Sequence, residues 1–124
     1  MPISITTTSG GTGYVDIRVG DGHGIHQGWL DVSALTSADD ADGYLPPGLP
    51  IAADGTPVGS SEDAYGIIGP EAVKMGSADH FANMIFTGPV NRNAIEDNLG
   101  RALSADELAG IASGCPGIKL IYQT

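Results

Sequence analysis

Residues 103–122 read LSADELAGIASGCPGIKLIY, and this stretch carries the clearest local structure signals in the chain. Ser104 is followed three residues later by Glu107, which is the spacing of a capping box, where each side chain hydrogen-bonds the backbone of the other residue at the start of a helix. This spacing predicts a helix over residues 104–113. The apolar and β-branched residues 118–122 are typical of a strand. The C-terminal part is therefore predicted to be a short capped helix that leads into a closing strand.

The predicted helix carries its own boundary signals and one apolar face. Leu103 and Leu108 occupy the positions of a hydrophobic staple, which fixes the direction from which the chain enters a helix. Gly114 is placed to end the helix, because glycine is the residue preferred just past a helix C-terminus. Leu108, Ile111 and Ala112 recur at helical spacing, so they are predicted to form the face that packs on the rest of the protein.

Upstream of the helix, short apolar runs alternate with turn signals. Residues 44–58 read as tight turns around short extended pieces, since their prolines exclude a helix and an Asp-Gly pair at 54–55 favours a turn. Residues 65–68 and 81–86 are predicted strands. The second is apolar at nearly every position, so it is expected to be buried on both faces, with Pro89 closing it. The predicted core residues are Ile67, Ile68, Met84, Ile85, Phe86, Leu108, Ile111, Ile118 and Leu120.

The preceding part, residues 14–43, is predicted to be a strand or hairpin extension followed by a linker. Residues 15–19 alternate apolar and polar side chains, which is typical of a half-buried strand. Residues 25–32 form a weaker strand candidate that contains the single tryptophan, Trp29. Residues 33–43 are rich in aspartate and end in glycine, which favours an exposed acidic linker.

Residues 1–13 are predicted to be a flexible N-terminal arm. They are rich in Thr, Ser and Gly, and Ile3 and Ile5 are the apolar residues among them after the initial methionine. Such a segment buries too little apolar surface to offset the entropy lost on ordering. Its β-branched residues would still suit a strand if a partner supplied a sheet edge.

The composition favours a single, mostly β domain with one or two short helices. The chain of 124 residues has 19 glycines and 8 prolines, which suit short strands and many turns. It has 5 Lys and Arg residues against 15 Asp and Glu, a net charge of −10. This balance argues against nucleic acid or an anionic membrane as partners. The N-terminus lacks the pattern of a signal peptide, and no apolar run reaches the length of a bilayer span, so a soluble protein made in a cytoplasm is expected.

The residues that could carry chemistry form no convincing site. His23 and His26 lie near two aspartates, and zinc accepts such ligands, but their glycine-rich surroundings favour a solvated turn. Cys115 lacks a basic neighbour, so a buried structural cysteine is expected. Most acidic residues lie in polar segments and aromatic residues are few, which argues against a glycosidase. We therefore expect no enzyme activity, no metal and no cofactor.

Four sequence blocks, taken together in this order, resemble the lambda-type bacteriophage head decoration proteins. The blocks are YLPPGLPIAADGTP at 44–57, AYGIIGPEAV at 64–73, MIFTGPVNRNAI at 84–95 and the helix-strand stretch at 103–122. The third block is interpreted as a strand ending at a glycine before a polar turn. The resemblance covers residues 44–124, which would form the decoration-protein β core.

This resemblance implies a β-clip-like domain that forms a homotrimer, and a structural rather than an enzymatic role. Such trimers bind the major capsid protein on the outer surface of the expanded head and brace it against packaged DNA, after synthesis in the host cytoplasm. In the family, the N-terminal segment contacts the capsid and becomes ordered on binding. Carried over to this chain, the capsid-contact residues would be Pro2, Ile3, Ser4, Ile5, Thr6, Thr7 and Thr8.

Two other classes of function are compatible with the sequence. One is a virion surface module that binds carbohydrate or a receptor, and an exposed aromatic platform around Trp29 and Tyr14 would favour it. The other is a small hydrolase, which would require a pocket that holds Cys115 near a histidine, or a pair of carboxylates.

Overall fold

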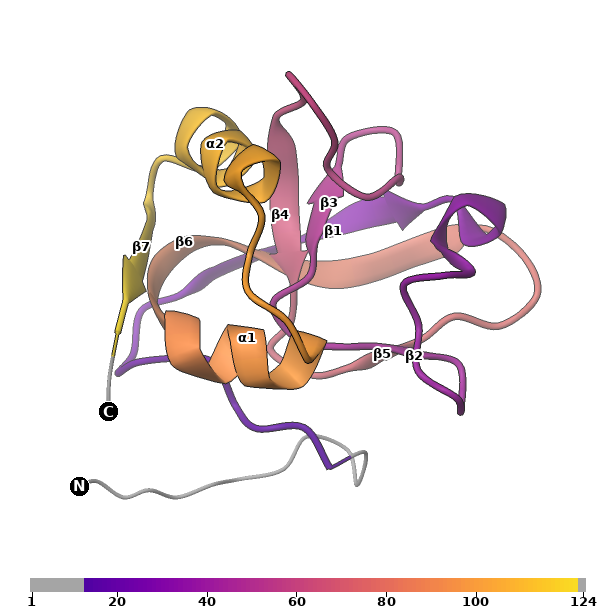
Figure 1. The fold of residues 1–124 in the computed structure, drawn as a ribbon, viewed down its shortest axis with the longest axis horizontal. Helices are drawn as coiled ribbons and strands as arrows, with labels where there is room; N and C mark the ends of the chain where they lie inside the picture. Colours follow the sequence, from indigo (N-terminus) through magenta and orange to yellow (C-terminus); the bar gives the residue numbers. More distant parts are fainter. Residues whose placement is uncertain (1–12, 123–124) are drawn as a thin grey trace.

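The fold is organised by the long strand β6, which pairs with three other strands. The computed structural model describes residues 13–122, and in it β6 spans His80–Asn91. It pairs antiparallel with β1 (Gly24–Leu30) and β4 (Ala64–Ile68), and parallel with β7 (Ile118–Ile121). Figure 1 shows how β6 curves between these partners. The predicted strands at 25–32, 65–68 and 118–122 are thereby confirmed.

Short strands complete the sheet and add a small ribbon. β3 (Pro50–Ala52) pairs with β4, so the strand order is β1-β6-β4-β3, with β7 also on β6. β2 (Tyr44–Leu45) and β5 (Val73–Lys74) form a separate antiparallel pair. After β3 the chain turns at Gly55, whose positive φ of 87° suits glycine. The prediction of turns around short extended pieces in residues 44–58 is confirmed.

The predicted arm, residues 1–13, lies outside the described residues except for Gly13. The same holds for the residues proposed to contact the capsid, Pro2, Ile3, Ser4, Ile5, Thr6, Thr7 and Thr8.

Strand β6 is buried on both faces only at its centre. Met84 and Ile85 are fully buried and belong to two different core clusters, one on each side of the sheet. Successive side chains of a strand point to opposite faces, so this pair can contact both clusters at once. Phe81 and Phe86 are 60% and 37% exposed. The prediction that residues 81–86 are buried on both faces is therefore wrong at its ends, and Phe86 is not a core residue.

The remaining predicted core residues are buried or partly buried. Fully or almost fully buried are Ile67, Ile68, Met84, Ile85, Ile111 and Ile118. Leu108 and Leu120 are only partly buried and pack against the cluster that contains Ile85.

Pro89 lies inside β6 and does not close it, contrary to the prediction. At this position β6 runs beside β7 on one side and beside residues 17–19 on the other. The Pro89 carbonyl accepts a hydrogen bond from Val19 N at 3.1 Å, while Val90 and Asn91 continue the pairing with β7. A proline is tolerated in a strand where its missing N–H is not needed.

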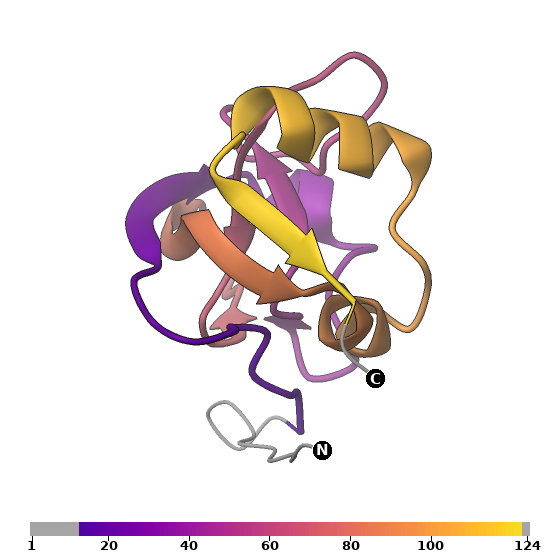
Figure 2. The ribbon, with the colours of Figure 1, turned by 90° about the vertical axis from the view of Figure 1, so that its left-hand side faces the viewer.

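Helix α2 (Ala105–Gly114) begins as predicted. The side chain of Ser104 accepts a hydrogen bond from Glu107 N, and the Glu107 side chain accepts one from Ser104 N, so the capping box is confirmed. The predicted apolar face is confirmed at Ile111, which is buried, and in part at Leu108, which packs against the core, but it is wrong at Ala112, which is exposed. Glu107 and Gly110 are also buried. The absence of a side chain on Gly110 allows the helix to approach Val58 and the backbone of Glu62 at this face. Figure 2 shows α2 above β7 and β6.

A second helix, α1 (Arg92–Leu99), occupies the stretch interpreted as a polar turn. Asn91 is its N-cap and accepts a hydrogen bond from Ala94 N at 3.2 Å. The helix ends at Gly100, which has a φ of 74°. The sequence contains both boundary signals of this helix, asparagine at the N-cap and glycine after the last turn. The helix between them is only about two turns long, so it gives a weak periodic pattern.

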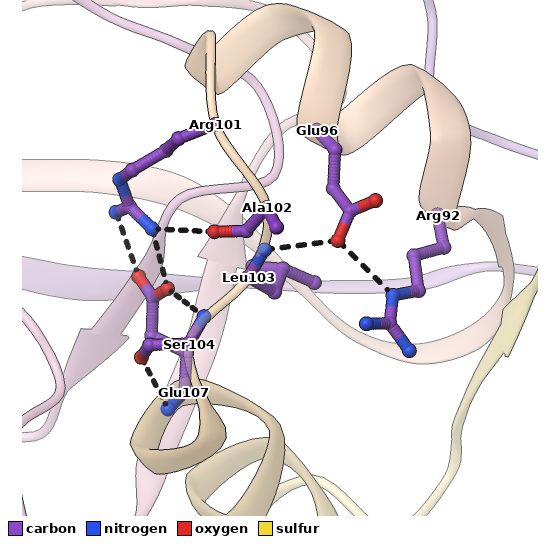
Figure 3. Close-up of polar contacts among 7 residues, drawn as sticks. All are labelled: Arg92, Glu96, Arg101, Ala102, Leu103, Ser104 and Glu107. Atoms are coloured by element: carbon purple, nitrogen blue, oxygen red, sulfur yellow. Dashed lines mark hydrogen bonds and ion pairs between the residues drawn. The ribbon is translucent and has the colours of Figure 1, made fainter.

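A polar network joins the two helices (Figure 3). Arg101 donates two hydrogen bonds to the carboxylate of Glu107, at 2.7 and 3.0 Å. Glu96 accepts hydrogen bonds from Arg92 in its own helix and from Leu103 N at the entrance of α2. Burial alone raises the pKa of Glu107, but the hydrogen bonds and charge of Arg101 and the Ser104 hydrogen bonds outweigh it, so the pKa lies below its ordinary value of 4.5.

Replacing Glu107 by glutamine is expected to lower the free energy of unfolding at pH 7 by about 2 kcal/mol, because hydrogen bonds to a charged group contribute about 1.5–3 kcal/mol. A carboxylate whose pKa is lowered by folding stabilises the folded state at pH values above its ordinary pKa of 4.5. This contribution is lost as the pH falls through the pKa that the group has in the folded state. Urea unfolding at pH 7 and pH 3 should therefore show the difference between wild type and Glu107→Gln shrinking in acid. Asp106→Asn, on the exposed side of the same turn, is the control. Equal stabilities at pH 7 would contradict the assignment.

Residues 14–43 are part of the core as well as supplying β1. Ile17, Leu30 and Leu35 are fully buried. The strand predicted at 15–19 is wrong, because Arg18 forms only an isolated bridge with Val90 before the chain turns away.

The acidic segment at 33–43 is ordered against the domain, so its prediction as an exposed linker is wrong in part. It begins in a short 3-10 helix, η2 (Val32–Leu35), that buries Leu35. Asp40 accepts hydrogen bonds from Tyr14 Oη and Tyr44 N, each at 2.9 Å. Burial and the neighbouring Asp40 carboxylate raise the pKa of Tyr14 to about 12.

The predicted fold class, a single mostly β domain with short helices, is confirmed. Within residues 13–122, neither helix has the length and apolar character needed to cross a bilayer.

Candidate interaction surface

The histidines of the sequence face backbone carbonyls. His23 Nε2 contacts Pro89 O, and His26 Nε2 lies 2.9 Å from Tyr65 O. The third histidine, His80, has Nε2 at 2.7 Å from Met75 O. Among residues 13–122, no group of three or more His, Cys, Asp or Glu side chains is placed to hold a metal ion.

Cys115 is a buried thiol that closes α2 onto β4. It is 3% exposed, and its Sγ donates to Ala64 O at 3.3 Å. Burial raises the pKa of the Cys115 thiol. A protonated, inaccessible thiol is a poor nucleophile, and the described residues bring no histidine into hydrogen-bond contact with it.

Cys115 is expected to react with Ellman's reagent at least ~100-fold more slowly in the folded protein than in urea, because both the raised pKa and burial protect it. Absorbance of the released thiolate at pH 8 gives both rates. A folded-state rate equal to that in urea would show that the thiol is accessible.

Exposed apolar side chains gather on β1, β4 and β6. Of the six large apolar side chains that are exposed within residues 13–122, all but Tyr122 lie on these three strands. Large apolar patches on a soluble domain commonly mark an interaction site. Successive residues of a strand point to opposite faces, so Ile25, Trp29 and Phe81 lie on one face of β1 and β6, opposite to His26 and the rings stacked on it. We call the following five residues, which are divided between these two faces, the aromatic surface: Ile25, Trp29, Tyr65, Phe81 and Phe86.

One part of the aromatic surface is a stack of three rings. His26 lies between Tyr65 and Phe86, with ring centroids 4.2 and 4.4 Å away and interplanar angles of 14° and 25°. Gly28 permits this approach, because a Cβ there would lie 3.0 Å from Cδ2 of Tyr65. In this stack the histidine contacts both of the half-exposed rings that flank it.

The other part is an aromatic pair beside an open groove. Trp29 and Phe81 are cross-strand partners in β1 and β6, and their rings meet edge to face with centroids 5.0 Å apart. Phe81 also lines a groove of about 510 Å³, together with Ile25, Gln27 and Asn83 of the same two strands. Residues 70–73 form the opposite wall.

The sequence suggested an aromatic platform around Trp29 and Tyr14, but in the structure Trp29 pairs with a different ring. Trp29 is at the surface, but its partner is Phe81 and not Tyr14, which is bound to Asp40 instead. The period of two in a strand places Trp29 on the same face of β1 as Ile25 and Gln27, but the mixed hydropathy of both faces does not mark which one is exposed. Its pairing with Phe81 depends on the β1–β6 register, which no local pattern specifies.

Comparison with protein-family models, with curated proteins and with solved structures found no match to this chain. The sequence blocks and the geometry described above are therefore the observations that bear on function.

Proposed function

We propose that this protein is a bacteriophage head decoration protein. In this proposal it binds as a homotrimer to the major capsid protein on the outside of the expanded head, and it stabilises the shell against the pressure of packaged DNA. The supporting observation is the ordered set of four sequence blocks, which resembles the lambda-type decoration proteins. Residues 44–122 of that stretch contribute six of the seven strands and both helices of a small β domain, consistent with a β-clip-like subunit.

The surface of the domain is compatible with a binding role. The aromatic surface supplies apolar area that a contact between subunits or with the capsid would bury. The net charge of −10 discourages adhesion to DNA and to anionic membranes. Three arms on one trimer would strengthen attachment through multivalency, and preference for the expanded lattice would stabilise that lattice by linkage.

The test is binding to heads assembled from the major capsid protein of the same virus. The purified protein should saturate expanded heads, leave unexpanded proheads bare, and raise the temperature at which expanded heads rupture. Cryo-electron microscopy would give the occupancy, and sedimentation would give the number of copies in each bound unit. Failure of the full-length protein to bind expanded heads would reject the proposal.

The second candidate is a virion surface module that binds carbohydrate or a receptor. One observation favours it, namely that Trp29 and Phe81 form an exposed aromatic pair next to a groove. A structural role on the capsid and ligand binding on the same outer surface are compatible with each other.

A further inference from the structure

One side of the groove lies along a face of β1 and β6, where cross-strand pairs follow one another; Gln27, Phe81 and Asn83 line the groove, and Trp29 stands behind Phe81 as its partner. Gln27 is the direct partner of Asn83, and the next pair on that face is Trp29 with Phe81. Residues two apart on a strand are separated by about 6.8 Å, so an amide pair and a ring pair lie side by side. Phe81 is the most exposed large apolar side chain among residues 13–122, at 60%.

The two amides are available to a ligand. Gln27 and Asn83 are both exposed, and both line the groove. Within residues 13–122, neither side chain has a protein hydrogen-bond partner. An amide offers donors and an acceptor at once, which matches hydroxyl groups, since these also donate and accept.

The charges around the groove select against ionic ligands. Glu71 contributes a carboxylate to the far wall, and no Lys or Arg lines the groove. Arg18 is close enough to Glu71 to interact with it electrostatically, which partly balances the carboxylate. With the net charge of −10, an anionic chain would be repelled, and a single balanced carboxylate is a weak site for a cation.

We propose that this groove binds a neutral saccharide chain. A sugar ring has a C–H face that packs on an aromatic ring and hydroxyls at its edge that hydrogen-bond to amides. Phe81, held by Trp29, supplies the ring face, and Gln27 and Asn83 bind the hydroxyls. This proposal does not depend on binding to the capsid, and it can be tested on the purified protein without phage heads.

The test uses the fluorescence of Trp29, which is the single tryptophan of the chain. Titration with cellohexaose, laminarihexaose and maltohexaose should give, for at least one of them, a saturable change with a dissociation constant on the order of 0.1–1 mM, typical of a shallow wet site. Hexagalacturonate, which is anionic, should give no saturable change. The side-chain NH₂ resonances of Gln27 and Asn83 should shift in NMR spectra with the hexasaccharide that binds.

Variants separate the groove from the rest of the surface. Phe81→Ala and Asn83→Ala should each weaken binding at least tenfold with little change in the melting temperature, since both residues are exposed. Tyr122→Ala, which removes an exposed ring that does not line the groove, should leave affinity unchanged. The proposal is overturned if no neutral hexasaccharide binds, if Phe81→Ala binds as tightly as wild type, or if a proline-rich decapeptide saturates the groove and the saccharides do not.

Discussion

Replacing Gly114 by alanine is expected to destabilise the fold by about 3 kcal/mol or more, the upper range for a group forced into a packed site. A Cβ at this position would lie 2.1 Å from Ala64 O and 2.7 Å from Ala64 N, and both are backbone atoms that cannot rotate away. The helix end cannot easily withdraw, because Ser113 hydrogen-bonds Asp63 and Cys115 hydrogen-bonds Ala64. The substitution should therefore push α2 off β4.

The sign of this effect makes the test decisive. In an unhindered helix, glycine to alanine stabilises by about 1 kcal/mol, so helix propensity alone predicts the opposite result. Thermal unfolding should show a fall of roughly 10 °C for Gly114→Ala, given the usual entropy of unfolding for a domain of this size. Ala112→Leu adds more volume on the exposed face of the same helix and should change stability by less than about 0.5 kcal/mol. A Gly114→Ala variant as stable as wild type would show that α2 does not contact β4 in this way.

Deleting residues 2–8 is expected to abolish binding to expanded heads while leaving the domain folded. Within residues 13–122, the members of both core clusters lie between Val15 and Leu120, so we expect the domain to fold without residues 2–8. If each arm adds a strand to an edge of the major capsid protein, loss of all three arms of a trimer should weaken binding at least about 100-fold. Occupancy of heads, measured by cryo-electron microscopy over a concentration series, gives the effect, and the melting temperature checks the fold.

Point variants within the arm test how it would bind. Ile3→Ala combined with Ile5→Ala should weaken head binding strongly, because alternate side chains of an added strand face pockets of the partner. Ser4→Ala, between them, is the matched control and should bind like wild type. Full occupancy of heads by the deleted protein would reject a capsid-binding arm and place the contact in residues 14–43 instead.

The sequence predictions are correct where the interactions involved join residues that are close together in the chain. The capping box of Ser104 and Glu107 was correct because its hydrogen bonds join residues three positions apart. Helix α1 was missed although Asn91 and Gly100 carry its caps, because proline and glycine at 88–89 suggested a turn. The surface site was seen only in part: Trp29 was identified, but Phe81 and the amides of Gln27 and Asn83 were not.

Local chemistry in the sequence was sufficient for the mostly β class, the turns at 44–58, the capped helix and the terminal strand. These features depend on backbone preferences and on contacts between neighbours in the chain, and both can be recognised from the sequence. The sequence also placed Ile67, Ile68 and Ile111 correctly in the core, but the burial of β6 along its length depends on the tertiary structure. Phe86 is exposed, and Pro89 stays within a strand, because the partners of β6 change along its length. Burial and register are properties of contacts between distant segments, and only the folded chain brings those segments together.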